Sequence, residues 1–252
     1  ISLAAFNVEN LSLSKIRNPK VAEVIAEVIR TFDLTAVQEV RDDQVVWRLL
    51  EIINAPLGTA YQAILTPNVG ANERYAIFYR SNRLTVKAKG TYSGGFYFLR
   101  LPYIFEVTAG NFDFTLVCIH ANHVDTQKEL ANLAQVLFKL VEEEETDRDL
   151  VLLGDLNADC TAFNENDLSH PLRDPAFVWL ISNEMDTSVD PTDCTRDRII
   201  VSANVASERY VADSAGVFLF DQHLGISASL ARTVSDHYPV FAWFEIGSPD
   251  KD

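Results

Sequence analysis

The chain has 252 residues, 48% of them hydrophobic, which is enough to bury one large core. No apolar run approaches the roughly 20 residues of a membrane span, and the start, ISLAAFNVEN, lacks a methionine and a basic leader, so we expect a mature or trimmed terminus. The formal net charge of -15 argues against a broad basic surface that would bind nucleic acid through its phosphates.

Short apolar runs rich in β-branched and aromatic residues predict ten strands. In chain order they are Leu3–Phe6, Leu34–Gln38, Tyr61–Leu65, Tyr75–Tyr79, Leu84–Ala88, Ile104–Val107, Phe112–Ile119, Leu150–Leu153, Arg198–Val201 and Tyr238–Phe244.

Three helices are expected between these strands. The first follows Asn18 and Pro19, which suit an N-cap and a first helical position, and its apolar residues recur at helical spacing. The second is predicted from Asp42 to Ile53, and the third from Asp125 to Glu144. Strands interleaved with amphipathic helices predict an α/β fold, a four-layer α/β/β/α sandwich in which two mixed, mainly antiparallel sheets pack face to face between helices.

The chain shows no internal repeat and no low-complexity linker, so one catalytic domain is expected over residues 1–246. The polar segment GSPDKD, residues 247–252, is either a true terminus or the stub of a linker to a further domain. An acidic cluster from Glu142 to Asp149 is expected to end an exposed helix.

A metal-ligand type of side chain repeatedly follows an apolar strand run, at Asn7, Glu39, His120 and Asp155, while Asp197 and Asp236 stand just ahead of other strands. One such residue is usually a turn former, but several with complementary chemistry predict a cleft at one edge of the sandwich. Carboxylates gathered there need a cation, because like charges a few ångströms apart repel. Oxygen ligands favour Mg²⁺ or Mn²⁺ over zinc.

The segments QEVRD, GDLNADC and SDHYPV carry a resemblance to the deoxyribonuclease I family of the endonuclease/exonuclease/phosphatase superfamily. It covers nearly the whole chain, from AAFNV through NERYAIFYR and DCTRDRIIV to SDHYPV. The resemblance implies a secreted, metal-dependent endonuclease that cuts mainly double-stranded DNA with little sequence specificity and leaves 5′-phosphate and 3′-hydroxyl ends. With the acidic charge, it suggests a salt-tolerant monomer without a membrane partner.

The resemblance also assigns the catalytic residues. It implies that Glu39 holds the catalytic Mg²⁺, or Mn²⁺, and it places around the metal and the scissile phosphate Asn7, Asp155, Asn157 and Asp236. Two histidines match the family pattern, each with a carboxylate partner: His120 with Glu73, and His237 with Asp197. We expect His237 to be the general base and His120 the acid, an assignment that stays open. The remaining histidines, His123, His170 and His223, are expected at the surface.

Two arginines match family positions. Arg100 aligns with an arginine on a phosphate oxygen, although a structural salt bridge would also explain it. Arg41 aligns with a minor-groove residue, with a solvated charge at a helix start as the alternative.

The loop before Cys194 resembles the family's structural calcium loop, with Asp186, Ser188, Asp190 and Thr192 as the oxygen donors; a plain turn is the alternative. Cys160 and Cys194 sit where the family has its large-loop disulfide, which favours an oxidising compartment. Cys118 lies inside the run FTLVCI and is expected to be a buried free thiol.

The chain departs from the family at two DNA contacts, with Ala71 in place of a stacking tyrosine and Glu9 in place of a basic residue. The segment TYSGGFYFLRLP is short and cysteine-free, so a second small disulfide and calcium loop are expected to be missing. Weaker DNA affinity than the family norm follows, which a separate DNA-binding module beyond GSPDKD would offset.

Two alternatives remain. One is a phosphoesterase of the same superfamily acting on a phospholipid or inositol phosphate, because such enzymes share the metal glutamate and the histidine pairs. The other is a catalytically silent member that binds a protein partner, although every catalytic position that can be placed is intact.

Overall fold

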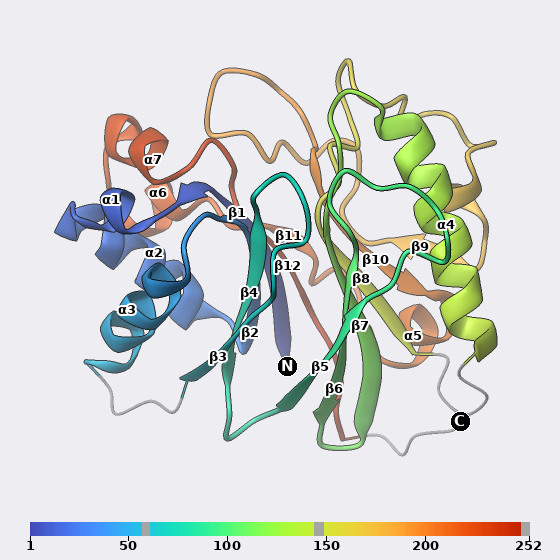
Figure 1. Cartoon of the computed structure of the whole chain (residues 1–252), viewed down its shortest axis with the longest axis horizontal. Helices are drawn as coiled ribbons and strands as arrows, with labels where there is room; N and C mark the ends of the chain where they lie inside the picture. Colours follow the sequence, from blue (N-terminus) through green and yellow to red (C-terminus); the bar gives the residue numbers. More distant parts are fainter. Residues whose placement is uncertain (57–60, 144–148, 248–252) are drawn as a thin grey trace.

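The computed structural model describes residues 1–56, 61–143 and 149–247, which form two six-stranded sheets packed between helices (Figure 1). The first sheet has the order β11-β12-β1-β2-β4-β3 and the second the order β5-β6-β7-β8-β10-β9. Among the described strands, only β1 with β2 and β7 with β8 pair in parallel. The four-layer α/β/β/α sandwich expected from the sequence is confirmed.

The strands and helices have the following bounds. The first sheet contains β1 (Ser2–Leu11), β2 (Leu34–Val40), β3 (Tyr61–Leu65), β4 (Arg74–Arg80), β11 (Gly216–Val217) and β12 (Val240–Trp243). The second contains β5 (Thr85–Thr91), β6 (Tyr103–Ala109), β7 (Phe112–His120), β8 (Leu150–Asp155), β9 (Phe177–Trp179) and β10 (Asp197–Ser202). The helices are α1 (Leu13–Ile16), α2 (Pro19–Thr31), α3 (Asp43–Asn54), α4 (Thr126–Glu143), η1 (Pro171–Arg173), α5 (Ala203–Glu208), α6 (Phe220–Leu224) and α7 (Ala228–Val234).

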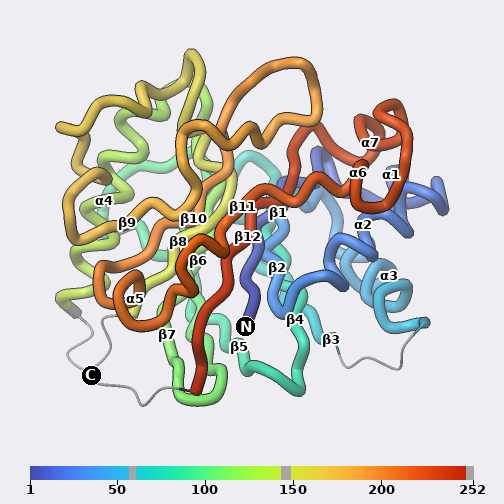
Figure 2. The backbone as a smooth tube through the Cα atoms, turned by 180° about the vertical axis from the view of Figure 1, so that it is seen from behind, coloured from blue at the N-terminus to red at the C-terminus, as the bar shows by residue number. Residues whose placement is uncertain are grey.

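Three apolar clusters hold the layers together. One lies between the two sheets and includes Leu3, Ile77, Phe105 and Leu153. A second joins the outer face of the first sheet to α1, α2, α3, α6 and α7, and the third joins the second sheet to α4. Figure 2 shows β1 in the middle of the molecule, beside the C-terminal strand β12 with which it pairs.

The predicted helices begin where their caps indicate. The Asn18 side chain accepts a hydrogen bond from the backbone N–H of Lys20 at 3.1 Å, and Pro19 stands at the first helical position. The Asp42 side chain accepts one from Val45 N at 2.9 Å and caps α3. Within the described ranges, no helix is long and apolar enough to cross a membrane. Most of the predicted tail, residues 248–252, and part of the acidic cluster, residues 144–148, lie outside the described residues.

Two sequence expectations about strand ends are wrong. Asn7 and Glu39 do not follow their strands but lie inside β1 and β2. The pairing of β1 with β2 shifts register between Asn7 and Leu11, and Glu39 has a positive φ of 61°. A bulge of this kind re-aims side chains near a strand end, and its local register is not visible as hydrophobic alternation.

Gly154 is required by the close approach of β8 to β7. Its φ is +146°, and a Cβ there would lie 2.0 Å from the carbonyl oxygen of Ile119. Both residues directly precede site residues, since Ile119 comes before His120 and Gly154 before Asp155. The glycine therefore sets the spacing of the two strands where they enter the site.

We expect Gly154→Ala to lower the free energy of unfolding by about 3 kcal/mol, measured by urea denaturation, because both the backbone conformation and the clash oppose it. The matched control is Gly90→Ala, whose φ is +120° but whose Cβ would meet no atom within 4 Å. The control should lose only about 1 kcal/mol. Equal losses in the two variants would contradict the steric role of Gly154.

Candidate active site

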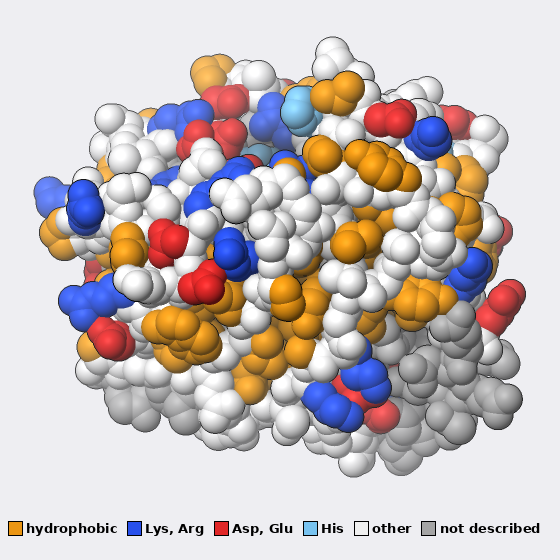
Figure 3. Space-filling view, viewed as in Figure 1, with side chains coloured by type: hydrophobic (Ala, Val, Ile, Leu, Met, Phe, Trp, Pro, Cys, Tyr) orange, Lys and Arg blue, Asp and Glu red, His pale blue; other side chains and the backbone are white. Residues whose placement is uncertain are grey.

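A cleft of about 540 Å³ opens at the edge of the sandwich where β1, β2, β7 and β8 end. In Figure 3, a histidine and side chains of both charges gather at this upper edge. The residues that line the cleft are Asn10, Glu39, Arg41, Arg100, His120, His123, Asp155, Asn157, Asp159, Cys160, Thr161, Ala162, Asp190, Arg196, Asp236 and His237. Most of the residues that the sequence predicted for catalysis therefore meet in one place.

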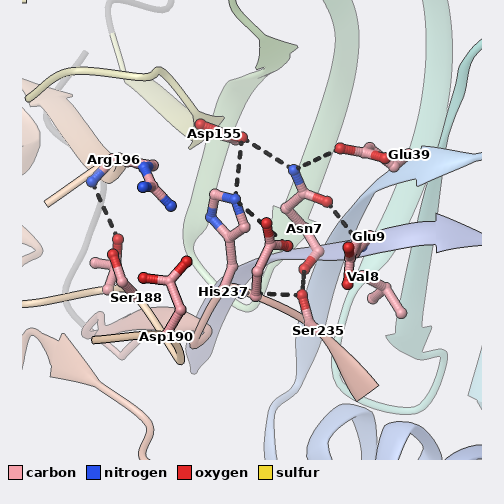
Figure 4. A network of polar contacts seen from close by, with 12 residues as sticks. Asn7, Val8, Glu9, Glu39, Asp155, Ser188, Asp190, Arg196, Ser235 and His237 are labelled. Atoms are coloured by element: carbon pink, nitrogen blue, oxygen red, sulfur yellow. Dashed lines mark hydrogen bonds and ion pairs between the residues drawn. The ribbon is translucent and has the colours of Figure 1, made fainter. Parts of the chain in front are cut away.

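Asp155, at the end of β8, lies at the centre of the site (Figure 4). Its Oδ2 accepts a hydrogen bond from Asn7 Nδ2 at 2.9 Å and lies 3.3 Å from His120 Nε2 and 3.7 Å from His237 Nε2. Burial opposes ionisation of this carboxyl, but the two imidazoles and Asn7 outweigh it and lower its pKa. One buried carboxylate thus gathers nitrogen atoms that come from both sheets.

Glu73, just before β4, is fully buried and joins three site residues. Its Oε1 accepts from His120 Nδ1 at 2.7 Å and from the backbone N–H of Glu39 at 3.1 Å. Its Oε2 accepts from Arg100 Nε at 2.6 Å. The predicted pairing of His120 with Glu73 is present in the structure, and it leaves Nε2 as the ring nitrogen that faces the cleft.

Asp197, the first residue of β10, orients the second histidine. Its Oδ2 accepts from His237 Nδ1 at 2.7 Å, and both side chains are buried. The loop around Ser188 fixes the backbone of His237, because Tyr238 N donates to Thr187 O and Val189 N donates to Asp236 O. The predicted pairing of His237 with Asp197 is therefore present as well.

The carboxylates hold protons on both imidazoles. Burial alone would lower the pKa of His237, but Asp197, Asp155 and Asp236 outweigh burial and raise it to about 10. Burial likewise opposes the charged form of His120, while Asp155 and Glu73 raise its pKa. The His237 ring is therefore protonated near neutral pH, and the same carboxylates favour the charged form of His120.

The oxygen ligands needed for a divalent cation lie together. Asn7 Nδ2 donates both to Asp155 Oδ2 and to Glu39 Oε1, the latter at 3.2 Å, so one amide separates two carboxylates. Glu39, Asp155, Asn157 and Asp236 all line the cleft. Burial raises the pKa of Glu39, but His120, Asn10, Asn7 and Arg41 outweigh it and keep this carboxyl ionised. Carboxylate and amide oxygens in this arrangement suit a hard cation such as Mg²⁺ or Mn²⁺.

Both predicted arginines, Arg41 and Arg100, form salt bridges with carboxylates of the site. Arg41 Nη2 lies 3.1 Å from Glu39 Oε2 and 3.8 Å from Glu73 Oε2, and Arg41 Nε donates to Asn10, so Arg41 is not a freely solvated charge. Arg100 forms a buried salt bridge with Glu73, as one of the two interpretations predicted. Its Nη1 is also buried and has no hydrogen-bond partner in the described part of the chain. Arg100 also lines the cleft, so other atoms of its guanidinium can meet an anion there.

Asp186, Ser188, Asp190 and Thr192 form a loop that is closed by its own hydrogen bonds. Asp186 Oδ1 accepts from the backbone N–H groups of Ser188 and Cys194, and Ser188 Oγ donates to Cys194 O. Asp190 Oδ1 accepts from the backbone N–H and the hydroxyl of Thr192. The Cys160–Cys194 disulfide closes this region, and Cys118 is free and buried, as expected.

Sequence reasoning missed several residues around the site. Glu129 on α4 is buried, and its carboxylate accepts from Leu99 N and Asn122 N, next to the segments that carry Arg100 and His120. No local motif identifies such a residue, because its partners lie in other parts of the chain. His123 lines the cleft, and His170 is buried against Phe163 and caps η1, so the expectation of a surface position is wrong for His170.

Comparisons with known proteins agree with this geometry. Residues 4–237 match the model of the endonuclease/exonuclease/phosphatase family. The chain is 32% identical over 256 residues to deoxyribonuclease-1 of Homo sapiens and 30% identical to that of Bos taurus, with 95% of this chain and 90% of each relative covered. Among solved structures, D. rerio TDP2 complexed with single strand DNA product has a TM-score of 0.71 at 15% identity, covering 97% of this chain and 98% of that one. A family protein from Bacteroides thetaiotaomicron has a TM-score of 0.69 at 18% identity and 97% and 94% coverage, so these two structures support the fold.

The raised pKa of His237 predicts a pH-dependent stability of the protein in EDTA. Because the folded pKa is about 10 and the unfolded value about 6.5, the contribution of the charged ring is complete below about pH 6.5 and is lost as the pH rises towards 10. The free energy of unfolding should fall by up to about 1.4 kcal/mol per pH unit between those values. Urea denaturation from pH 6 to pH 10.5 measures it.

The same series for His237→Gln should be flatter, because that side chain does not titrate. His223→Gln, at an exposed position of α6, serves as the control and should follow the wild type. Parallel curves for the wild type and His237→Gln would rule out this linkage.

Proposed function

This chain belongs to the endonuclease/exonuclease/phosphatase family, and within it to the deoxyribonuclease I family, and from this premise we propose that it is a metal-dependent endonuclease that hydrolyses phosphodiester bonds in DNA. The observation that carries the proposal is the buried Asp155 carboxylate between two carboxylate-paired histidines, with the Asn7 amide joining it to Glu39. Such a site can both accept and donate a proton at a phosphate.

In the proposed mechanism, Glu39, Asp155 and Asp236 would hold the cation, with Asn7 and Asn157 beside them. When bound, a divalent cation neutralises the charge that develops on the phosphate and helps to supply a nucleophile. Arg100, which lines the cleft, binds a phosphate oxygen through its guanidinium. Asn157 is held by its amide on Ala121 O at 3.0 Å, which leaves its oxygen for the site.

The two histidines divide the proton transfers. His237 accepts a proton from the attacking water at Nε2, because Asp197 holds its Nδ1. His120 donates a proton from Nε2 to the leaving 3′ oxygen, because Glu73 holds its Nδ1. The products are 5′-phosphate and 3′-hydroxyl ends. If Asp155 and Asp236 coordinated a cation, their effect on His237 would weaken, which would lower the pKa of its imidazole and favour the neutral ring that can accept a proton.

The finer features of the proposal rest on chemistry outside the site. The Cys160–Cys194 disulfide supports secretion into an oxidising compartment. The net charge of -15 supports a salt-tolerant monomer, since like-charged surfaces repel. Double-stranded DNA is the proposed substrate, with little sequence specificity, because the site residues act on phosphate rather than on base edges. A single catalytic domain over residues 1–246 is part of the same proposal.

The test is nicking of supercoiled plasmid with Mg²⁺, with Mn²⁺ and with EDTA. We expect metal-dependent nicking that His237→Ala and Glu39→Gln each reduce by at least about 10³-fold, since the first removes the proposed base and the second a proposed ligand. The matched control is His223→Ala, at an exposed position away from the cleft, which should retain full activity.

Two other outcomes would redirect the proposal. No nicking at any salt concentration, together with turnover of a phospholipid or an inositol phosphate, would assign the site to another phosphoesterase of the superfamily. Metal-independent nicking that survives both substitutions would exclude the proposed mechanism.

The loop of Asp186, Ser188, Asp190 and Thr192 is our proposed structural Ca²⁺ site. We expect 1 mM Ca²⁺ to raise the thermal midpoint of the wild type by a few degrees, because a ligand that binds only the folded state stabilises it. Asp186→Asn should lose this increase, whereas Asp213→Asn, at an exposed position, should keep it. Equal increases in all three proteins would show that Ca²⁺ does not bind to this loop.

A further inference from the structure

We propose that Arg196 binds a backbone phosphate of the DNA strand on the His237 side of the cleft, beyond the phosphate that is cut. This inference rests on the proposed function and adds a substrate-binding residue to that site. Arg196 is not among the residues singled out from the sequence, and it directly precedes Asp197, the carboxylate that orients His237.

The main chain of Arg196 is fixed on both sides. Its backbone N–H donates to Thr187 Oγ1 at 3.0 Å, and its carbonyl oxygen accepts from Leu156 N at 3.1 Å and from Ala158 N at 3.3 Å. The half-buried side chain lines the same cleft as His237 and Asp236. The backbone that carries the Arg196 guanidinium is therefore held rigidly at the wall of the cleft.

The charge of Arg196 lacks the carboxylate partner that the other two cleft arginines have. Arg41 and Arg100 each form a salt bridge with a site carboxylate. Arg196 donates one side-chain hydrogen bond, from Nη2 to the neutral hydroxyl of Thr192 at 3.2 Å. In the described part of the chain, no carboxylate oxygen lies within 4.0 Å of its nitrogens.

A cation with one neutral partner is unexpected in a protein with 36 acidic and 21 basic residues. A partly desolvated guanidinium gains most from an anion that accepts two parallel hydrogen bonds, and a phosphate diester presents two such oxygens. The cleft thus holds a guanidinium without a directly hydrogen-bonded carboxylate, although the Asp190 carboxylate lies beyond the Thr192 hydroxyl.

The position of Arg196 defines which part of the strand it would meet. In Figure 4, Arg196 and Asp190 lie on one side of His237, while Asn7 and Glu39 lie on the other. Arg41 and Arg100 contact Glu73, the partner of His120. Cationic groups therefore flank the two histidines on opposite sides, as required to hold a strand on both sides of the cut.

At the amino-terminal edge of the cleft the described cations are already engaged, since Lys15 Nζ donates to the carbonyl oxygens of Val8 and Glu9. Glu9 stands there and forms an ion pair with Arg232 at 2.7 Å, so the charge of Arg232 is already neutralised. Ala71 provides no aromatic surface. We therefore expect Arg196 to carry a larger share of DNA binding than a single phosphate contact usually does.

The experiment measures kcat and KM on a short DNA duplex at fixed Mg²⁺ between 50 and 200 mM NaCl. Arg196→Ala should raise KM about tenfold at the lower salt and change kcat less than about threefold. Because one phosphate contact is lost, the slope of log(kcat/KM) against log[NaCl] should become shallower by about 0.9. Arg196→Lys should keep most of the slope, since it keeps the charge.

Arg17→Ala is the matched control, because it removes the charge of an exposed arginine that does not line the cleft. It should retain the wild-type slope. If Arg17→Ala reproduces Arg196→Ala, or if Arg196→Lys is as impaired as Arg196→Ala, the inference is overturned. An unchanged KM and slope in Arg196→Ala with an active wild type overturns this inference alone. An inactive wild type overturns the proposed function, and with it this inference.

Discussion

The negative charge of Asp155, buried where the two sheets meet, is the constraint on which the rest of the site depends. A buried carboxylate is tolerated only with compensating donors, and here Asn7 of the first sheet and the rings of His120 and His237 provide them. Those rings in turn require Glu73 and Asp197 to fix their orientation. The pairing of β7 with β8, and of β8 with β10, sets the spacing of these groups.

The same charge balance links stability to activity. Without a cation, the protons on the two imidazoles compensate the buried carboxylates, and both rings have raised pKa values. A divalent cation and those protons neutralise the same negative charge, so they compete. A divalent cation at those carboxylates would therefore lower the pKa of His237 and favour the neutral ring that the proposed base requires.

The acidic composition and the proposed DNA substrate are compatible because charge is distributed unevenly. In the cleft, arginines lie next to carboxylates, and some of these carboxylates are candidate metal ligands. Arg41 and Arg100 form salt bridges with Glu39 and Glu73, respectively. The side chain of Arg196 instead donates a hydrogen bond to the neutral hydroxyl of Thr192. Local arrangement, more than net charge, thus decides what this protein can bind.

The sequence by itself determined the two-sheet α/β architecture through its hydrophobic periodicity, and the helix starts through the caps Asn18 and Asp42. The motifs QEVRD, GDLNADC and SDHYPV identified the residues that meet in the cleft. All of these are local signals in the chain. The sequence did not predict short elements such as β9, β11 and α5, because the stability of such elements comes from tertiary contacts. Only the tertiary structure decided that Asn7 and Glu39 lie within bulged strands and that His170 is buried. It also decided that Glu129 is buried against Leu99 and Asn122, and that Arg196 lines the cleft. Register, burial and charge pairing join residues distant in the chain, so no local pattern encodes them.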